Sequence, residues 1–187
     1  MRAILLSAAL LLPLGACASV TENHAGPMAP ERATMGDFGE ATLKNAAGES
    51  IGRAVLTQGP TGLLIRIEAT GLTPGWHGVH IHTTGRCDAP FTSAGGHINH
   101  AAPVPHGLLN PEGPDDGDLP GIFAGADGRV NAEVFTSQAR IAATGPGQWL
   151  WDDDGAALVI HANPDDQHSQ PIGGAGARVA CGVMAAG

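Results

Sequence analysis

The chain has 187 residues, a formal net charge of -9 at pH 7 and a single lysine, Lys44. This acidic balance, with no basic patch, excludes a partner that is bound through its phosphate backbone, such as a nucleic acid. The 28 glycines, 14 prolines and 4% aromatic residues favour a β-rich fold with many turns over a helical bundle. The length fits one domain together with processing segments.

The chain begins with the features of a secretory signal. Arg2 precedes an apolar run over residues 3–14, which is too short to span a membrane as a helix. The sequence LGAC at residues 14–17 resembles the bacterial lipobox, in which the cysteine is lipidated and becomes the new N-terminus. We therefore expect residues 1–16 to be a lipoprotein signal peptide and Cys17 to carry a lipid anchor. The alternatives are a plain signal peptide and an uncleaved anchor.

The next segment, residues 17–36, is rich in Ala, Pro and Glu and has no periodicity, which is typical of a flexible tether. The folded domain is expected over residues 37–187, in an exported protein tethered to a membrane of the periplasm. Without Cys17, the free cysteines are Cys87 and Cys181. An even pair in an oxidising compartment indicates one disulfide.

Short strand patterns follow one another along the folded domain, separated by turn signals such as AAGES and GPTG. The pair Asp127 and Gly128 is a strong hairpin signal. About eight short strands, two long loops and no convincing amphipathic helix indicate an all-β, eight-stranded Greek-key barrel or sandwich. The expected strands cover residues 40–45, 50–58, 62–70, 76–83, 121–126, 129–136, 156–161 and 178–184.

Six of the nine histidines lie in residues 75–120. In the sequence VHIH, His80 and His82 stand two residues apart, so both imidazoles project from one face of an extended strand. That is a metal-chelating geometry. The loop beyond is rich in glycine and proline, and it needs something to order it, which a metal ion would supply. Potential ligands recur through this loop at His97, His106, Asp115 and Asp118.

Seven sequence blocks resemble the secreted bacterial copper/zinc superoxide dismutases. They run from about Asp37 to Met184 and cover the expected folded domain. The resemblance implies a Greek-key barrel with a metal-binding loop and an electrostatic-type loop. It also implies an exported enzyme that converts superoxide to oxygen and hydrogen peroxide by redox cycling of copper, with a structural zinc. In chain order the blocks are GWHGVHIH, GRC, SAGGHIN, HGLLNPEGP, GDLP, LVIHANPDD and GARVACGV.

The resemblance assigns the copper ligands to four histidines, of which His97 also bridges to zinc and takes a proton when copper is reduced. Imidazole suits copper because it tolerates both oxidation states. Arg178 matches the family arginine that guides and hydrogen-bonds superoxide. A permanently charged guanidinium supplies a local positive focus in an acidic protein. The copper ligands implied are His80, His82, His97 and His161.

The zinc side departs from the family pattern. His97, His106 and Asp118 match zinc-ligand positions, but Asp115 stands where the family has another histidine. A site of two histidines and two aspartates can bind zinc, although it places more negative charge on the ion. His100 stands where the family usually has proline. It is either a compensating ligand or a solvent-exposed loop residue.

Four further residues are assigned by the resemblance to the family and by strand geometry. Cys87 and Cys181 match the family disulfide, which ties the loop after the copper strand to the last strand. Asp165 matches an aspartate that hydrogen-bonds metal-ligating histidines. His77 lies three residues before His80 and so points to the opposite strand face, where we expect a hydrogen-bonded structural histidine.

The altered zinc position keeps two other functions open. One is a superoxide-dismutase-like copper-binding or metal-buffering lipoprotein with little activity, and the other is a copper-only enzyme. The expected partners are superoxide and, through the lipid anchor, a membrane. Both a monomer and a homodimer are compatible with the sequence.

Overall fold

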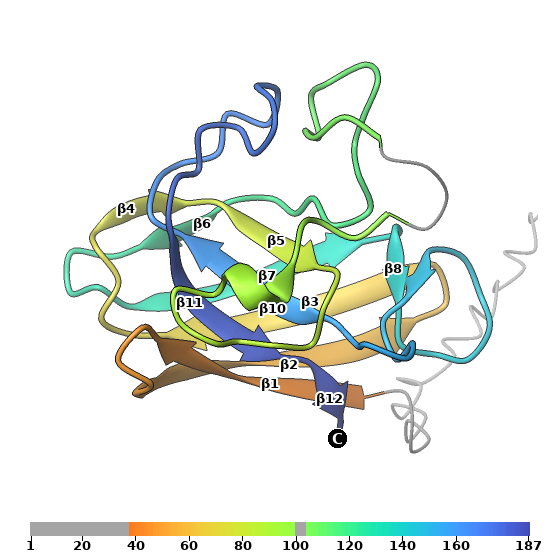
Figure 1. Cartoon of the computed structure of the whole chain (residues 1–187), viewed down its shortest axis with the longest axis horizontal. Helices are drawn as coiled ribbons and strands as arrows, with labels where there is room; N and C mark the ends of the chain where they lie inside the picture. Colours follow the sequence, from red (N-terminus) through yellow and green to blue (C-terminus); the bar gives the residue numbers. More distant parts are fainter. Residues whose placement is uncertain (1–37, 100–103) are drawn as a thin grey trace, which may run out of the picture. The chain divides into compact units, whose positions relative to one another are not determined.

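The structure is a computed structural model that describes residues 38–99 and 104–187 (Figure 1). Within these ranges the chain forms twelve strands and one short 3-10 helix, η1 (Thr92–Ala94), and no α-helix. The all-β class expected from the composition is confirmed. None of the described helical segments has the length and apolarity needed to cross a membrane.

Eight strands form one sheet in the order β5-β10-β11-β1-β2-β3-β7, with β12 also paired to β1. All of these pairings are antiparallel. Two small sheets join β4 (Gly75–His77) to β6 (Ile122–Ala124), and β8 (Ala139–Arg140) to β9 (Gln148–Trp149). The strands of the large sheet are β1 (Phe38–Asn45), β2 (Ser50–Gly59), β3 (Gly62–Ala69), β5 (Val79–His82), β7 (Val130–Thr136), β10 (Ala157–His161), β11 (Arg178–Val183) and β12 (Ala185–Ala186).

Alternation of side chains builds the core. In β1, Ala41 and Leu43 are buried while Thr42 between them is exposed, as the period of two in a half-buried strand requires. Strand β10 differs, because all five of its residues are buried. Its Leu158 faces the main core, whereas Val159 packs in a second apolar cluster with residues of the loop that carries η1. Strand β10 is therefore covered on both faces.

The single strand expected over residues 76–83 is divided into β4 and β5 at Gly78. The N–H of Gly78 donates to the carbonyl of Asn163 at 2.9 Å. A Cβ atom at Gly78 would lie only 2.8 Å from the Cβ of Ala175, so the close approach requires glycine. At this point the chain passes from the β4–β6 sheet to the large sheet.

The turn expected at Asp127 and Gly128 is present, since Gly128 has φ 72° and its N–H donates to the carbonyl of Gly125. The flanking strands do not pair with each other, however: β6 pairs with β4, and β7 pairs with β3. The hairpin expectation is therefore wrong about the partners. A turn signal is local, whereas the partner of a strand depends on the rest of the sheet.

Two long loops contact each other at one edge of the barrel; the part of the first loop that follows residue 103 and the second loop lie at the top of Figure 1, whereas the part with η1 lies lower in the view. The metal loop is defined as residues 83–121 and the second loop as residues 162–177. The main-chain N–H of Leu109 in the metal loop donates to the carbonyl of Gln167 in the second loop at 3.0 Å. These loops and the ends of β5, β10 and β11 surround the histidines.

Candidate metal centre

Four histidines converge from three places in the fold. His80 and His82 lie on β5, His161 ends β10, and His97 joins His82 through an isolated antiparallel bridge. One potential ligand atom from each of the four lies within 4.8 Å of the others. His80, His82 and His161 are buried and His97 is half-buried.

One ring nitrogen of each histidine has no hydrogen-bond partner in the described structure although it is buried. Buried polar atoms are nearly always hydrogen-bonded, so four such atoms turned toward one another indicate the place of a bound ion. Nitrogen-only coordination suits copper among other transition metals. The residues therefore fit the expected copper. The unpartnered atoms are Nδ1 of His80 and Nε2 of His82, His97 and His161.

The opposite ring nitrogens are anchored. His82 donates from Nδ1 to the carbonyl of Gly95, and His161 donates from Nδ1 to the carbonyl of Gly176, both at 3.0 Å. Each bond places the proton on Nδ1 and leaves Nε2 free to act as a ligand. Burial lowers the pKa of His82 to about 2 and that of His161 to about 4, so both rings are neutral at neutral pH.

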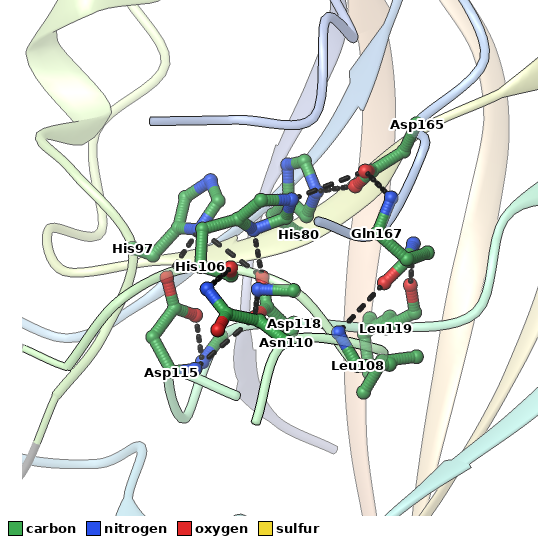
Figure 2. A network of polar contacts seen from close by, with 12 residues as sticks. His80, His97, His106, Leu108, Asn110, Asp115, Asp118, Leu119, Asp165 and Gln167 are labelled. Carbon is green, nitrogen blue, oxygen red and sulfur yellow. Dashed lines mark hydrogen bonds and ion pairs between the residues drawn. The ribbon is translucent and has the colours of Figure 1, made fainter. Parts of the chain in front are cut away.

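Asp165 links the two sides of the site. Its Oδ2 lies 2.7 Å from Nε2 of His80 and its Oδ1 lies 3.1 Å from Nε2 of His106 (Figure 2). The carboxylate is fully buried. Burial alone would raise its pKa, but the hydrogen bonds from His106 and His80 outweigh burial and hold the pKa well below its usual range. Asp165 is therefore charged and orients both rings.

A second group of potential ligands adjoins the first. His97, His106 and Asp118 lie together with His80, again with one ligand atom of each within 4.8 Å of the others. Nδ1 of His106 makes a short contact with Oδ1 of Asp118, and Nδ1 of His97 lies 3.4 Å from the same oxygen. Because Nε2 of His97 faces the first group, the ring of His97 stands between the two groups.

In the second group, carboxylates and imidazoles stabilise each other's charged forms. Burial disfavours the charged form of His106, but its hydrogen bonds to Asp118 and Asp165 outweigh burial and raise its pKa to about 10. Burial is likewise outweighed at Asp118, where the bonds from His106 and His97 lower the pKa of the carboxyl. A set of imidazole and carboxylate ligands suits zinc.

Asp115 faces this second group and not solvent, with 4% of the residue exposed. Its Oδ2 lies 2.8 Å from Nδ1 of His97, and its Oδ1 accepts from the N–H of Gly117 at 3.0 Å. It is not among the four residues whose ligand atoms all lie within 4.8 Å. His100 lies outside the described residues, so its part in the zinc site stays a prediction.

Arg178 lies at the start of β11, opposite His161 in the strand pairing. Its Nη1 donates to the carbonyl of Phe91 at 2.6 Å and its Nη2 to the carbonyl of Gly95 at 2.5 Å. Partial burial lowers the pKa of Arg178, yet a guanidinium stays charged at any physiological pH. A fixed positive charge therefore lies beside the first group of histidines.

A disulfide joins Cys87 to Cys181, the expected pair, with 5.6 Å between the Cα atoms. It ties the metal loop to β11, three residues beyond Arg178. Cys181 packs with Phe91 in the second apolar cluster. The disulfide therefore holds together the two segments that Arg178 connects.

His77 is hydrogen-bonded, as expected, although it lies on β4 and not on one strand with His80. It is buried, with Nδ1 2.6 Å from the carbonyl of His161 and Nε2 2.8 Å from the carbonyl of Thr73. The sequence did not indicate the main-chain acceptors at Phe91, Gly95 and Gly176, because a carbonyl group carries no side-chain signature.

Comparison with known proteins agrees with this geometry. Residues 50–184 match the family model described as copper/zinc superoxide dismutase (SODC). A relative named superoxide dismutase [Cu-Zn] from Caulobacter vibrioides is 50% identical over 145 residues, which cover 77% of this chain and 83% of the relative. One from Aquifex aeolicus is 45% identical, with 77% of this chain and 85% of the relative covered.

Solved structures show the same fold. A double mutant of a SOD-like protein from Bacillus subtilis is 38% identical with a TM-score of 0.73, and the match covers 78% of this chain and 97% of that one. The Cu/Zn superoxide dismutase from Brucella abortus is 31% identical with a TM-score of 0.62, with 78% and 98% covered. The chain belongs to the copper/zinc superoxide dismutase family.

Proposed function

We propose that the protein is a superoxide dismutase in which two superoxide anions and two protons yield one O₂ and one H₂O₂. The single observation that carries the proposal is the set of four buried, unpartnered imidazole nitrogens aimed at one another beside a fixed guanidinium. Family membership and the names of relatives at up to 50% identity support the same reaction.

The first group of histidines would hold copper. Bound copper would supply the chemistry, by accepting an electron from one superoxide and returning it to a second. His82 and His161 are fixed by hydrogen bonds to the main chain, and His80 by Asp165. Ligands that are anchored in this way need little reorganisation during electron transfer.

Arg178 would bind the substrate. Superoxide is a small anion and the chain carries a net charge of -9, so approach to the site needs a local positive field. The guanidinium uses Nη1 and Nη2 to bind the carbonyls of Phe91 and Gly95. These bonds fix its plane, and its remaining N–H groups are donors for an incoming anion.

His97 would connect the two metals and carry a proton. Its Nε2 belongs to the copper side, while its Nδ1 contacts the carboxylates of Asp115 and Asp118. A proton held at Nε2 is inside the site whenever this nitrogen is not a ligand. The second group would hold zinc through His97, His106 and Asp118. We propose Asp115 as the remaining zinc ligand, because its side chain is buried against His97.

The place of action is also proposed. The lipobox at residues 14–17 supports export to the periplasm and tethering through a lipid on Cys17, with residues 17–36 as the spacer. Mass spectrometry of the protein purified from membranes should find a lipidated N-terminus at Cys17. A Cys17→Ser variant should be released from the membrane; retention of this variant would contradict the anchor.

The copper assignment can be tested with a matched pair of variants. His161→Ala should lose most of its bound copper and its dismutation activity, because one of four buried ligands is removed. His168→Ala, on the exposed part of the second loop, should behave like the wild type. Full copper occupancy and full activity in His161→Ala would contradict the proposal.

A further inference from the structure

Two glutamines of the second loop bind the main chain of the metal loop, one at His106 itself and the other at residues that follow His106 and Asp118. Gln170 makes a two-bond contact with His106: its Oε1 accepts from the N–H of His106 at 3.0 Å, and its Nε2 donates to the carbonyl of His106 at 2.8 Å. A primary amide can satisfy a peptide residue in this way in only one orientation. Within the metal loop, Asn110 also donates to this carbonyl, at 3.0 Å.

Gln167 holds the next part of the same loop. Its Oε1 accepts from the N–H of Leu108 at 3.2 Å, and its Nε2 donates to the carbonyl of Leu119 at 3.1 Å. Leu108 and Leu119 follow His106 and Asp118 by two residues and one residue. Figure 2 shows the side chain of Gln167 reaching from Asp165 to both leucines.

The backbone conformations of both loops fit the contact between Gln167 and Gly107. Gln167 has φ 58°, a left-handed conformation that a non-glycine residue keeps only where its surroundings fix it. Its N–H donates to Oδ1 of Asp165 at 2.7 Å. Opposite, Gly107 has φ 119°, and a Cβ atom there would lie 2.3 Å from the carbonyl oxygen of Gln167. The two loops therefore approach each other as closely as their main chains allow.

The position of His106 depends on both loops. Its Nδ1 contacts Asp118 of the metal loop, and its Nε2 contacts Asp165 of the second loop. If the loops separated, His106 would lose one of the two carboxylates that orient its ring. The side chains of Gln167 and Gln170, which we call the glutamine clasp, make direct hydrogen bonds between the two loops next to His106 and Asp118.

We infer that the glutamine clasp positions His106 and Asp118 for the second metal. Neither glutamine contacts a ligand atom, so each acts through the main chain of the metal loop. The inference rests on the proposed function, because it assumes that His97, His106 and Asp118 bind an ion. Removal of residues that orient a metal ligand typically weakens metal binding by about 10- to 100-fold.

The test is a cobalt titration of protein whose copper site is already filled, read by visible absorption, in which Co²⁺ reports both affinity and ligand geometry. Gln167→Ala and Gln170→Ala should each raise the Kd for Co²⁺ about tenfold and alter the absorption bands. Gln170→Glu keeps an acceptor for the N–H of His106 but sets a carboxylate oxygen against the carbonyl of His106, so its Kd should rise at least as much as that of Gln170→Ala. Amide hydrogen exchange at His106 and Gly107 should quicken in the alanine variants.

The matched control is Gln148→Ala. Gln148 also uses its side-chain amide locally, toward Trp149 and Asp152, but it lies on β9 and contacts neither loop. It should leave the Kd and the spectrum unchanged. If a clasp variant only stabilised the fold less, its unfolding midpoint would change but its cobalt spectrum would not. That result would overturn the positioning role.

The outcomes separate the inference from the proposed function. If the wild type binds Co²⁺ and all clasp variants bind it equally, with the same spectrum, only the inference fails. If the wild type binds no Co²⁺, the proposed second site and the inference both fail. A ratio of Kd values near ten with an altered spectrum, in variants that keep full copper content, supports the clasp.

Discussion

Arg178 and His82 donate hydrogen bonds to the same oxygen, the main-chain carbonyl of Gly95, at 2.5 Å and 3.0 Å. One acceptor therefore fixes both the cation proposed to receive superoxide and a proposed copper ligand. The residue bearing that carbonyl has φ 79°, and a Cβ atom there would lie 2.2 Å from Oγ1 of Thr83. Glycine is thus required at position 95, where Arg178 and His82 bind the same carbonyl.

Replacing Arg178 separates substrate guidance from metal binding. Arg178→Gln removes a positive charge beside the histidines, so kcat/KM for superoxide should fall by about tenfold and lose much of its dependence on ionic strength. Copper and zinc content should stay at the wild-type level. Stopped-flow kinetics at several salt concentrations measures the effect.

The control for this change is Arg86→Gln. Arg86 is exposed and pairs with Asp88 at 2.9 Å. Its removal should leave kcat/KM within about twofold of the wild type, because exposed ion pairs contribute little. Equal losses in the two variants would show that total charge, and not the position of Arg178, determines the rate.

Asp165→Asn should weaken the binding of both metals. The variant loses the negative charge that orients His80 on one side and His106 on the other, and comparable changes cost roughly 10- to 100-fold in metal affinity. Competition with a chelator measures each Kd. Asp166→Asn, which changes an exposed neighbour that bonds only within its own loop, is the control. Loss of only one metal from Asp165→Asn would contradict the linking role.

The copper-side pair on β5 could be predicted from the sequence because a spacing of two in a strand is sufficient to place His80 and His82 on one face. His97 is different. It reaches the group through an isolated bridge to His82 from the far side of a loop segment, residues 83–96, and no local pattern encodes that contact. For this residue the sequence showed only a histidine recurring in a loop that needs ordering, and the family resemblance assigned its place in the copper group.

Long-range packing also explains what the sequence could not place. The division of one expected strand at Gly78 follows from Asn163 and Ala175, which are more than eighty residues away. The surroundings of Asp115 were equally hidden, since its contact with His97 joins residues that lie 18 positions apart. Composition predicted the all-β class, but loop geometry came only with the structure.

Asp115 can be tested by substitution in both directions. Asp115→Ala should lower the affinity of the second site for zinc by at least about tenfold, since a buried carboxylate against His97 is lost. Asp115→His should bind zinc at least as tightly as the wild type, because imidazole is a good zinc ligand. Glu112→Ala, an exposed change in the same loop, serves as the control. Unchanged zinc affinity in Asp115→Ala would exclude Asp115 as a ligand.

The two sites should respond differently to pH. In the metal-free protein, His106 has a pKa raised to about 10 and His97 also has a raised pKa, so a metal entering the second site must displace protons. Its affinity should fall as pH falls below about 10, by up to tenfold per unit for each proton released.

On the copper side, His82 and His161 have lowered pKa values, of about 2 and about 4, and are neutral well above these values. Between about pH 5 and 8 their ligation should release almost no protons. Zinc should therefore be lost before copper on acidification. Calorimetry in two buffers of different ionisation enthalpy counts the protons, and greater proton release with copper would contradict this account.

The disulfide should contribute strongly to stability. It spans a sequence separation of 94 residues, for which loop-closure entropy predicts a contribution of about 4 kcal/mol or somewhat more. A Cys87→Ser and Cys181→Ser double variant should lose that amount of unfolding free energy in urea, compared at equal metal content. A loss below about 1 kcal/mol would show that native contacts, not loop closure, dominate.

The most direct measurement is the metal content of the purified, disulfide-oxidised domain together with its rate of superoxide dismutation before and after addition of copper and zinc. We predict one copper and one zinc per chain, with activity that depends on copper. Activity with copper but without zinc would favour a copper-only enzyme. Tight copper binding without dismutation would contradict the enzymatic function and favour a metal-buffering protein.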